Sequence, residues 1–225
     1  MTKTLERLRR KTREVGPLYL ARLALRRLIP ARHFGLTRSV LLELRLAPRP
    51  QTPVAPAQVR WAGQDEHELL SSFGHAPETL RARMECGDRA CVLIREERLA
   101  AYAWFHRECY EEPDLGSRFR LRPDEIWLYD AMVAPSLRGR GIYPSFLTGA
   151  AELLEQEGFS RILVKVDEIN RNSMRAHCAA GAVPIATFQA LRLFGFTRVH
   201  DGRRADACWC RPGTWYVTDV PRSTP

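Results

Sequence analysis

The sequence has no run of about 20 uninterrupted apolar residues, so we expect no membrane-spanning helix. Residues 3–15 are charged throughout and have no apolar centre, unlike a secretory signal. We therefore expect a cytoplasmic protein. Its 225 residues, of which 45% are hydrophobic, suffice for one domain with a core and an appendage.

Paired metal-ligand spacings are also absent from the sequence. The six cysteines include no C-x-x-C, and the closest approach is Cys208 and Cys210 with His200 upstream. Because a tetrahedral zinc site takes four ligands, usually in closely spaced pairs, we expect free thiols and no metal.

Acidic residues are scarce in the first fifth of the chain. Residues 1–50 hold 13 Lys/Arg and 3 Asp/Glu, whereas residues 51–225 hold 22 and 23. Basic and apolar residues recur at helical spacing over residues 4–15 and 18–29, which predicts two cationic amphipathic helices.

This basic arm has three interpretations. It packs on the rest of the protein and keeps its arginines in water, or residues 1–30 lie on an anionic membrane surface. Nucleic acid is the least favoured partner, because arginines without interleaved aromatic residues make a poor surface for stacking bases.

We predict three regions along the chain. Residues 1–46 form the basic helical arm plus a short strand at 39–46. Residues 47–58 form a Pro-rich extended linker, and residues 59–225 form the main domain.

Hydrophobic periodicity and turn residues predict the elements of the main domain. Strands are predicted at 58–62, 90–108 (two, with a turn near 96–98), 125–133, 161–167 and 184–199 (one or two). Helices are predicted at 65–86 (two, with Pro77 opening the second), between the loop at 133–146 and Gly158, and at 173–180, and a polar loop is predicted at 109–124. This order predicts an α/β (α+β) fold, a mixed and mostly antiparallel sheet with helices on both faces.

The stretch VAPSLRGRGIYPSF, residues 133–146, lies between a predicted strand and a predicted helix. A glycine-rich loop at a helix amino terminus binds anions, because unpaired backbone N–H groups and the helix dipole both favour negative charge. Gly139 and Gly141 allow close backbone approach, and Arg138 and Arg140 add charge. Neither GxxxxGK[ST] nor GxGxxG occurs here, and RGRG alone is also compatible with a solvated basic turn.

Residues 131–143 resemble the acetyl-CoA-binding motif of the GCN5-related N-acetyltransferase (GNAT) superfamily. The lead-in Val133-Ala-Pro135, Arg138 and Gly141 match that motif, while Tyr143 stands where Gly or Ala is usual.

Residues 170–182 resemble a later segment of the same family, through Asn170, Ser173 and Gly181. In that segment His177 stands where the family commonly has a Tyr that protonates the departing CoA thiolate.

The resemblance implies a site for acetyl-CoA or another acyl-CoA. The strand before the loop separates from its neighbour in this family, which would free backbone N–H groups at Ala131 to Val133 for the thioester carbonyl and pantetheine. The residues implied to bind CoA are Met132, Val133, Arg138, Gly139, Arg140, Gly141, Ile142, Tyr143, Asn170 and Ser173.

Two residues are candidates for proton transfer. Asp130 is the first choice for the base because a carboxylate in a central strand is costly to bury without a role or a partner; the alternative is a salt bridge to an arginine. The other candidates for the base are Glu125, Glu108 and Tyr129. His177 is either the acid for the thiolate or an exposed helix residue.

The resemblance therefore implies an acyl-CoA-dependent N-acyltransferase that acts by direct attack of a primary amine. The acceptor would be a small molecule or a cell-envelope precursor. The alternative is a non-catalytic GNAT-fold module that binds CoA or a partner and docks on membrane through its basic arm. A third hypothesis is a modifying enzyme that is itself associated with nucleic acid, with its basic arm on phosphate.

Overall fold

The computed structural model describes residues 34–46, 59–63, 66–203 and 206–221. The helices predicted at 4–15 and 18–29, and the linker predicted at 47–58, lie outside the described residues.

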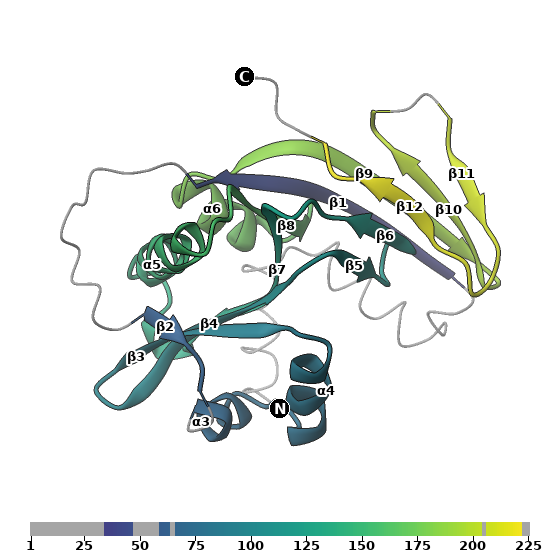
Figure 1. The fold of residues 1–225 in the computed structure, drawn as a ribbon. Coiled ribbons are helices and arrows are strands. Elements are labelled where there is room, and N and C mark those ends of the chain that lie inside the picture. Colours follow the sequence, from purple (N-terminus) through teal and green to yellow (C-terminus); the bar gives the residue numbers. More distant parts are fainter. Residues whose placement is uncertain (1–33, 47–58, 64–65, 204–205, 222–225) are drawn as a thin grey trace, which may run out of the picture.

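One large mixed sheet organises the structure (Figure 1). Its nine strands run in the order β11-β10-β9-β1-β8-β7-β4-β3-β2. Among the described strands of this sheet, only β7 and β8 pair in parallel, so the predicted mostly antiparallel sheet is confirmed. The strands are β1 Phe34–Arg45, β2 Val59–Trp61, β3 Arg89–Arg95, β4 Arg98–His106, β7 Glu125–Val133, β8 Arg161–Asp167, β9 Val183–Leu193, β10 Phe196–Asp201 and β11 Cys208–Cys210.

Strand β1 lies inside this sheet, between β9 and β8. We predicted residues 39–46, which include the second half of β1, as a strand that belongs to the arm outside the main domain. In the structure Leu42 lies opposite Val164 of β8 and Pro184 of β9, so the strand belongs to the sheet. The pattern within a strand gives its faces but not its distant partners, which is why the sequence did not predict this position.

Helices cover both faces of the sheet. On β3, Cys91 and Leu93 face the helix α5, whereas Ala90 and Val92 face α3 and α4. The helices are α3 Glu66–Ser72, α4 Pro77–Glu85, α5 Ile142–Gln156 and α6 Arg171–Ala179, with a 3₁₀ turn, η1, at Pro135–Leu137. None of the helices that the structure describes has the length and apolar character needed to cross a membrane.

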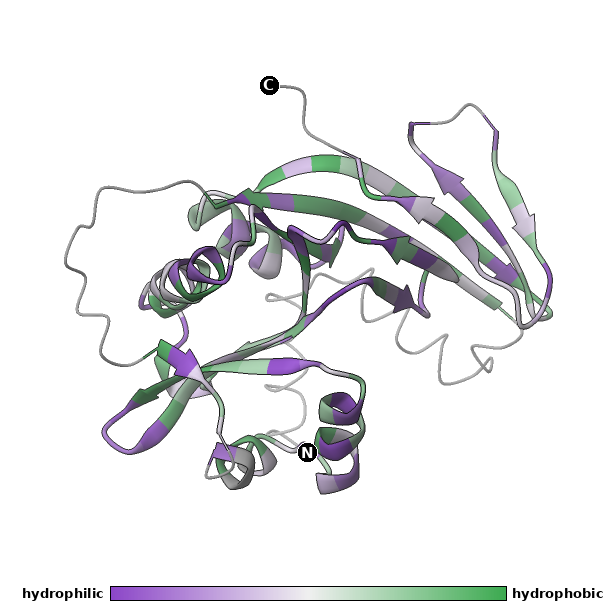
Figure 2. Cartoon of the chain, in the orientation of Figure 1, coloured by the Kyte–Doolittle hydropathy of each residue, from purple (hydrophilic) through white to green (hydrophobic). Residues whose placement is uncertain are grey.

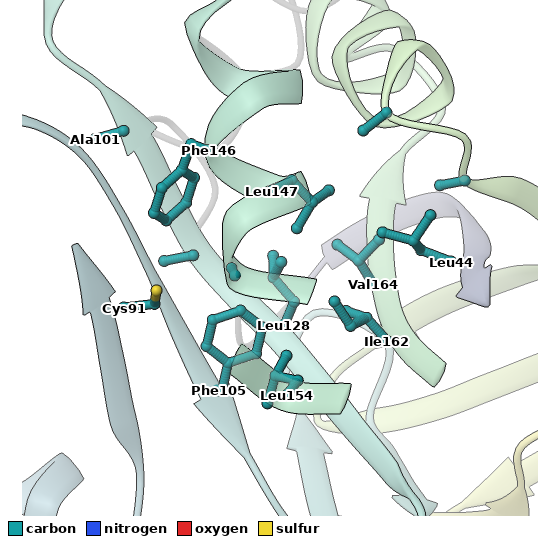
Figure 3. Packing of buried hydrophobic residues seen from close by; sticks show 14 of the residues in the cluster. Leu44, Cys91, Ala101, Phe105, Leu128, Phe146, Leu147, Leu154, Ile162 and Val164 are labelled. Atoms are coloured by element: carbon teal, nitrogen blue, oxygen red, sulfur yellow. The ribbon is translucent and has the colours of Figure 1, made fainter. Parts of the chain in front are cut away.

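Helix α5 forms the centre of the main core. Phe146, Leu147 and Leu154 on one of its faces pack against strand residues that include Leu128 and Val164 (Figure 3). These side chains are fully or almost fully buried. The spacing is that of an amphipathic helix, as predicted, and it fixes the amino terminus of α5 over β7 and β8.

Residues 109–124 form a hairpin, not the predicted polar loop. Strands β5 Cys109–Glu112 and β6 Ser117–Arg120 pair antiparallel, and β12 Tyr216–Asp219 adds to β6 in parallel to complete a second sheet. Phe119 and Tyr110, which pair across the hairpin, both stack on Trp127 of β7. The outward residues are charged, so the hairpin has the composition of a loop although its inner face is part of the core.

The sequence predicted one or two strands over 184–199, and the structure has two, β9 and β10; β11 was not predicted. Hydrophobic and hydrophilic residues alternate along these strands (Figure 2). This alternation matches strands that are covered on one face only.

Candidate active site

The two parallel strands β7 and β8 separate in the middle of the sheet. Their last pair is Leu128 with Val164. Beyond it β7 stays paired with β4 as far as Val133, and β8 stays paired with β1 as far as Asp167. The structure therefore contains the strand separation that the family resemblance implied.

The free edge of β7 offers backbone groups to this gap. The N–H of Ala134 donates to the carbonyl of Ala100 on β4, at 2.8 Å. Backbone groups alternate sides along a strand, so the N–H and C=O of Val133 face the gap while those of Met132 face β4. The carbonyl of Val133 accepts from Arg138 Nε at 3.2 Å.

A β-bulge precedes this free edge. Relative to β4, strand β7 carries one extra residue between Tyr129 and Met132, and Asp130 has a left-handed φ of 46°. A bulge re-aims neighbouring side chains. Here Arg83 of α4 contacts both Tyr129, 5.1 Å from the ring centroid, and Asp130, 2.6 Å from Oδ2.

The loop between β7 and α5 has the geometry of an anion site. Gly139 and Gly141 have φ values of 76° and 71°, which residues with a side chain rarely adopt. A Cβ on either glycine would meet no protein atom within 4 Å, so the space over both is open. Gly141 directly precedes the first turn of α5, whose N–H groups lack helical partners.

A pocket of about 980 Å³ passes through the gap between β7 and β8. The η1 turn, the loop, α5 and α6 line one part of it, and β5, β7 and β8 line the other. Of the predicted site residues, those that line it are Asp130, Met132, Val133, Arg138, Gly139, Gly141, Ile142, Tyr143, Asn170, Ser173 and His177. Arg140 is exposed and lies outside the lining.

His177 is buried and does not lie on an exposed helix face. Its Nδ1 lies 2.8 Å from the carbonyl oxygen of Ser173, which can only accept, so Nδ1 carries the proton. Its Nε2 therefore accepts from the Tyr143 hydroxyl at 2.7 Å. Burial lowers the pKa of His177 and raises the pKa of Tyr143, so both groups are neutral near pH 7.

Asn170 and Ser173 organise the start of α6. The side chain of Asn170 accepts from the N–H of Ser173 at 3.2 Å and caps the helix. This cap accounts for the asparagine on structural grounds and also fixes the turn that holds His177.

Asp130 forms a salt bridge to an arginine, which was the alternative to its role as the base. Arg83 Nη1 lies 2.6 Å from Oδ2, and the Tyr102 hydroxyl donates to Oδ1 at 3.3 Å. Burial, followed by the charge of Asp130, raises the pKa of Tyr102. The carboxylate lines the pocket but its oxygens are already engaged.

Asp88, His106 and Tyr129 form a second polar network. Asp88 accepts from His106 Nδ1 at 2.6 Å and from the Tyr129 hydroxyl, while His106 Nε2 donates to the carbonyl of Cys109 at 3.0 Å. Both ring nitrogens of His106 face acceptors, so the ring is doubly protonated. The hydrogen bond to Asp88 raises the pKa of His106, and burial raises that of Tyr129.

Of the other candidates for the base, Tyr129 lines the pocket, whereas Glu125 and Glu108 do not. Glu125 is buried at the far end of β7 and pairs with Arg161, which also pairs with Glu43. Glu108 lies outside the pocket lining, and the hydroxyl of Tyr129 is bound to Asp88.

Polar residues that the sequence analysis did not select also line the pocket, namely Tyr110, Glu112, Lys165, Asn172 and Arg175. Glu112 is 8% exposed, and Lys165 Nζ lies 3.3 Å from its Oε1. Burial raises the pKa of Glu112, and Lys165 partly opposes that effect. Sequence reasoning missed this strand because Glu111 and Glu112 give residues 109–112 the polar composition of a loop.

Within the described ranges, no group of three or more His, Cys, Asp or Glu side chains could hold a metal ion.

Comparison with known proteins supports the fold and the loop. The acetyltransferase (GNAT) family model matches residues 57–181. No curated protein matches the sequence. A structure described as an acetyltransferase of the GNAT family from Novosphingobium aromaticivorans DSM 12444 is 14% identical, with a TM-score of 0.50, over 69% of this chain and 63% of that chain.

A GNAT-family acetyltransferase from Colwellia psychrerythraea is 15% identical, with a TM-score of 0.50, over 75% of this chain and 60% of that chain. This chain thus covers less than two thirds of both structures, and at these identities the likeness shows the fold alone. The family match spans more than half of the sequence and includes the loop, the bulged strand and α6. The chain belongs to the acetyltransferase (GNAT) family.

Proposed function

We propose that this protein transfers an acyl group from acyl-CoA to a primary amine. The observation that carries the proposal is the separation of β7 and β8 after Leu128 and Val164. It opens one pocket that joins an anion-binding loop to a free strand edge, and these are the two features that a CoA thioester requires. Membership of the family supports the same conclusion.

The residues of the loop fit the diphosphate of CoA. Gly139 and Gly141 leave open space above the backbone, and the first turn of α5 adds unpaired N–H groups. Arg138 uses Nε on Val133 and, among the described residues, its two terminal nitrogens make no hydrogen bond, so they are available to an anion. Acetyl-CoA is the donor that we propose.

The thioester carbonyl would bind at the free edge of β7. The N–H of Val133 faces the gap and is positioned to polarise that carbonyl. A backbone donor aimed at developing oxyanion charge is worth about 2.7–4 kcal/mol.

We assign the hydroxyl beside the leaving thiolate to Tyr143 and a positioning role to His177. The sequence left His177 as either the acid for the thiolate or an exposed helix residue. We give it neither role, because its Nε2 accepts from the Tyr143 hydroxyl. His177 would hold the hydroxyl of Tyr143 at the wall of the pocket.

Asp130 is proposed to shape the acceptor end of the pocket, not to remove the proton of the amine. Its two carboxylate oxygens are engaged by Arg83 and by the hydroxyl of Tyr102. The acceptor remains the primary amine of a small molecule or of a cell-envelope precursor. Cytoplasmic residence, with membrane contact through residues 1–30, is part of the same proposal.

The proposal is tested in two steps. Calorimetry with acetyl-CoA measures binding, and release of free thiol measures transfer to a panel of amino sugars, amino acids and polyamines. We expect both binding and transfer. Binding without transfer to any amine would favour the non-catalytic module, and absence of binding would reject the CoA site itself.

A further inference from the structure

We propose that Glu112 accepts the proton of the attacking amine and that Lys165 holds its carboxylate in the pocket. This inference rests on the proposed acyl transfer and names the base for it. Glu112 comes from the hairpin β5–β6, outside both segments that resemble the family motifs.

The hairpin places Glu112 at the level where β7 and β8 separate. Tyr110, two residues before Glu112 on the same face of β5, stacks on Trp127 with ring centroids 4.9 Å apart. Lys165 is the first residue of β8 beyond its last pair with β7, at Val164. Its contact with Glu112 therefore lies at the mouth of the gap, and both side chains line the pocket.

The surroundings of Glu112 favour the acceptance of a proton. The residue is buried, burial is the largest cause of its raised pKa, and Lys165 is the cation that opposes it. The N–H of Asp114 also donates to Oε1, at 3.3 Å. The titratable and charged groups around Glu112 are Tyr110 and Asp114 of the hairpin, Tyr129 and Asp130 of β7, Lys165 and Asp167 of β8, and Arg192 of β9, which binds the carbonyl of Pro113.

The other carboxylates near the gap, Asp130 and Asp88, have closer cationic partners. Asp130, which also lines the pocket, is paired with Arg83 at 2.6 Å. Asp88 is paired with the doubly protonated His106 and lies outside the lining. Glu112 also has a cationic partner, Lys165, but at 3.3 Å, and burial is the largest influence on its carboxyl and raises its pKa.

The reaction removes two protons from the amine nitrogen. An ammonium group R–NH3⁺ gives one proton to the Glu112 carboxylate, and the freed nitrogen lone pair forms the C–N bond. The C–S bond breaks with its electron pair on sulfur, and the second proton lost by nitrogen ends on the thiolate. The products are the amide and the CoA thiol, and Glu112 returns its proton to solvent.

Glu112→Gln is the direct test, with Glu111→Gln as the matched control. Glu111 is the neighbouring residue on the opposite face of β5, where it pairs with Arg118. With acetyl-CoA and the best amine of the panel, we expect Glu112→Gln to lower kcat/KM about 100-fold or more, which is the range of general-base catalysis. Acetyl-CoA binding should stay within twofold of the original protein, and Glu111→Gln should change neither.

If Glu112 and Lys165 only held the two sheets together, changing the charges near Glu112 would not shift the pH dependence of kcat/KM. Two further variants therefore separate this structural role from the role of a base. Lys165→Met removes the charge that lowers the Glu112 pKa, and Asp114→Asn removes a charge that raises it. The acidic limb of kcat/KM should therefore move to higher pH in the first variant and to lower pH in the second. If Glu112→Gln does not fold, these shifts still decide the matter, together with ¹³C NMR titration of the side-chain carboxyls.

The two proposals fail in different ways. Transfer that survives Glu112→Gln, or an acidic limb that stays in place in both charge variants, overturns the role of Glu112 and leaves the acyltransferase intact. No transfer by the original protein to any amine overturns the proposed function, and the role of Glu112 with it.

Discussion

Replacing Gly141 by Ala tests the anion loop most directly. The left-handed φ of 71° costs a residue with a Cβ about 1–2 kcal/mol. Alanine also lowers the conformational entropy of the unfolded chain, which stabilises the folded protein by about 0.4–1 kcal/mol. The net loss of stability is therefore about 1 kcal/mol. For a chain of this size that is a fall in Tm of about 2–4 °C.

The same change should weaken CoA binding, because the new Cβ meets no protein atom within 4 Å and enters the open space above the loop. We expect the Kd for CoA to rise at least about tenfold, equivalent to about 1.4 kcal/mol. Gly158→Ala is the control. Its φ of 88° also lies in the left-handed region with open space around the Cβ, but it follows the other end of α5, about 22 Å away.

Calorimetry with CoA and thermal unfolding, run on both variants, separate the two effects. Both should lose similar stability, and only Gly141→Ala should lose affinity. Equal CoA affinity in the two variants would contradict the assignment of the loop.

The remaining predictions concern the buried polar groups. Tyr143→Phe leaves the Nε2 of buried His177 without its hydroxyl donor, so the free energy of unfolding in urea should fall by about 1–3 kcal/mol. Arg161→Met leaves the buried carboxylates of Glu43 and Glu125 without their shared cation and should cost about 3–5 kcal/mol, whereas Arg120→Met at an exposed pair with Asp219 should cost less than about 1 kcal/mol. Because the pKa of His106 is raised on folding, the protonated ring stabilises the folded protein fully at pH values below its unfolded pKa of about 6.5. This stabilisation is lost as the pH rises through the folded pKa, so the free energy of unfolding in urea should fall over that range in the original protein and not in His106→Asn. The pKa of His177 is lowered on folding, so its effect on stability has the opposite pH dependence. The stability associated with its neutral ring should be lost as the pH falls below about 6.5, the pKa in the unfolded chain.

Much of the fold could be predicted from local patterns. The two helices on either side of Pro77, the turn at 96–98 and the strand at 125–133 all have a periodicity or a turn residue within a few positions, and all are present. The hairpin at 109–120 was missed because its outward residues are charged, and its inward residues become core only when they meet Trp127.

The site residues also fall into those that the local sequence indicates and those that it does not. The residues of the loop and of α6 could be selected from the sequence, since glycines, arginines and a helix cap act within one turn of chain. Their partners could not. Nothing near His177 in the sequence indicates that Tyr143, 34 positions earlier, donates to it. Nothing near Asp130 indicates that Arg83 engages its carboxylate.

The sequence by itself determined the anion loop and the order of strands and helices around it, because φ preferences, capping and side-chain alternation are properties of neighbouring residues. Only the tertiary structure decided that β1 enters the middle of the sheet, that β7 and β8 separate after Leu128, and that Glu112 meets Lys165 there. These contacts join residues far apart in the chain. Their free energy depends on burial and charge that arise only when the distant segments pack together.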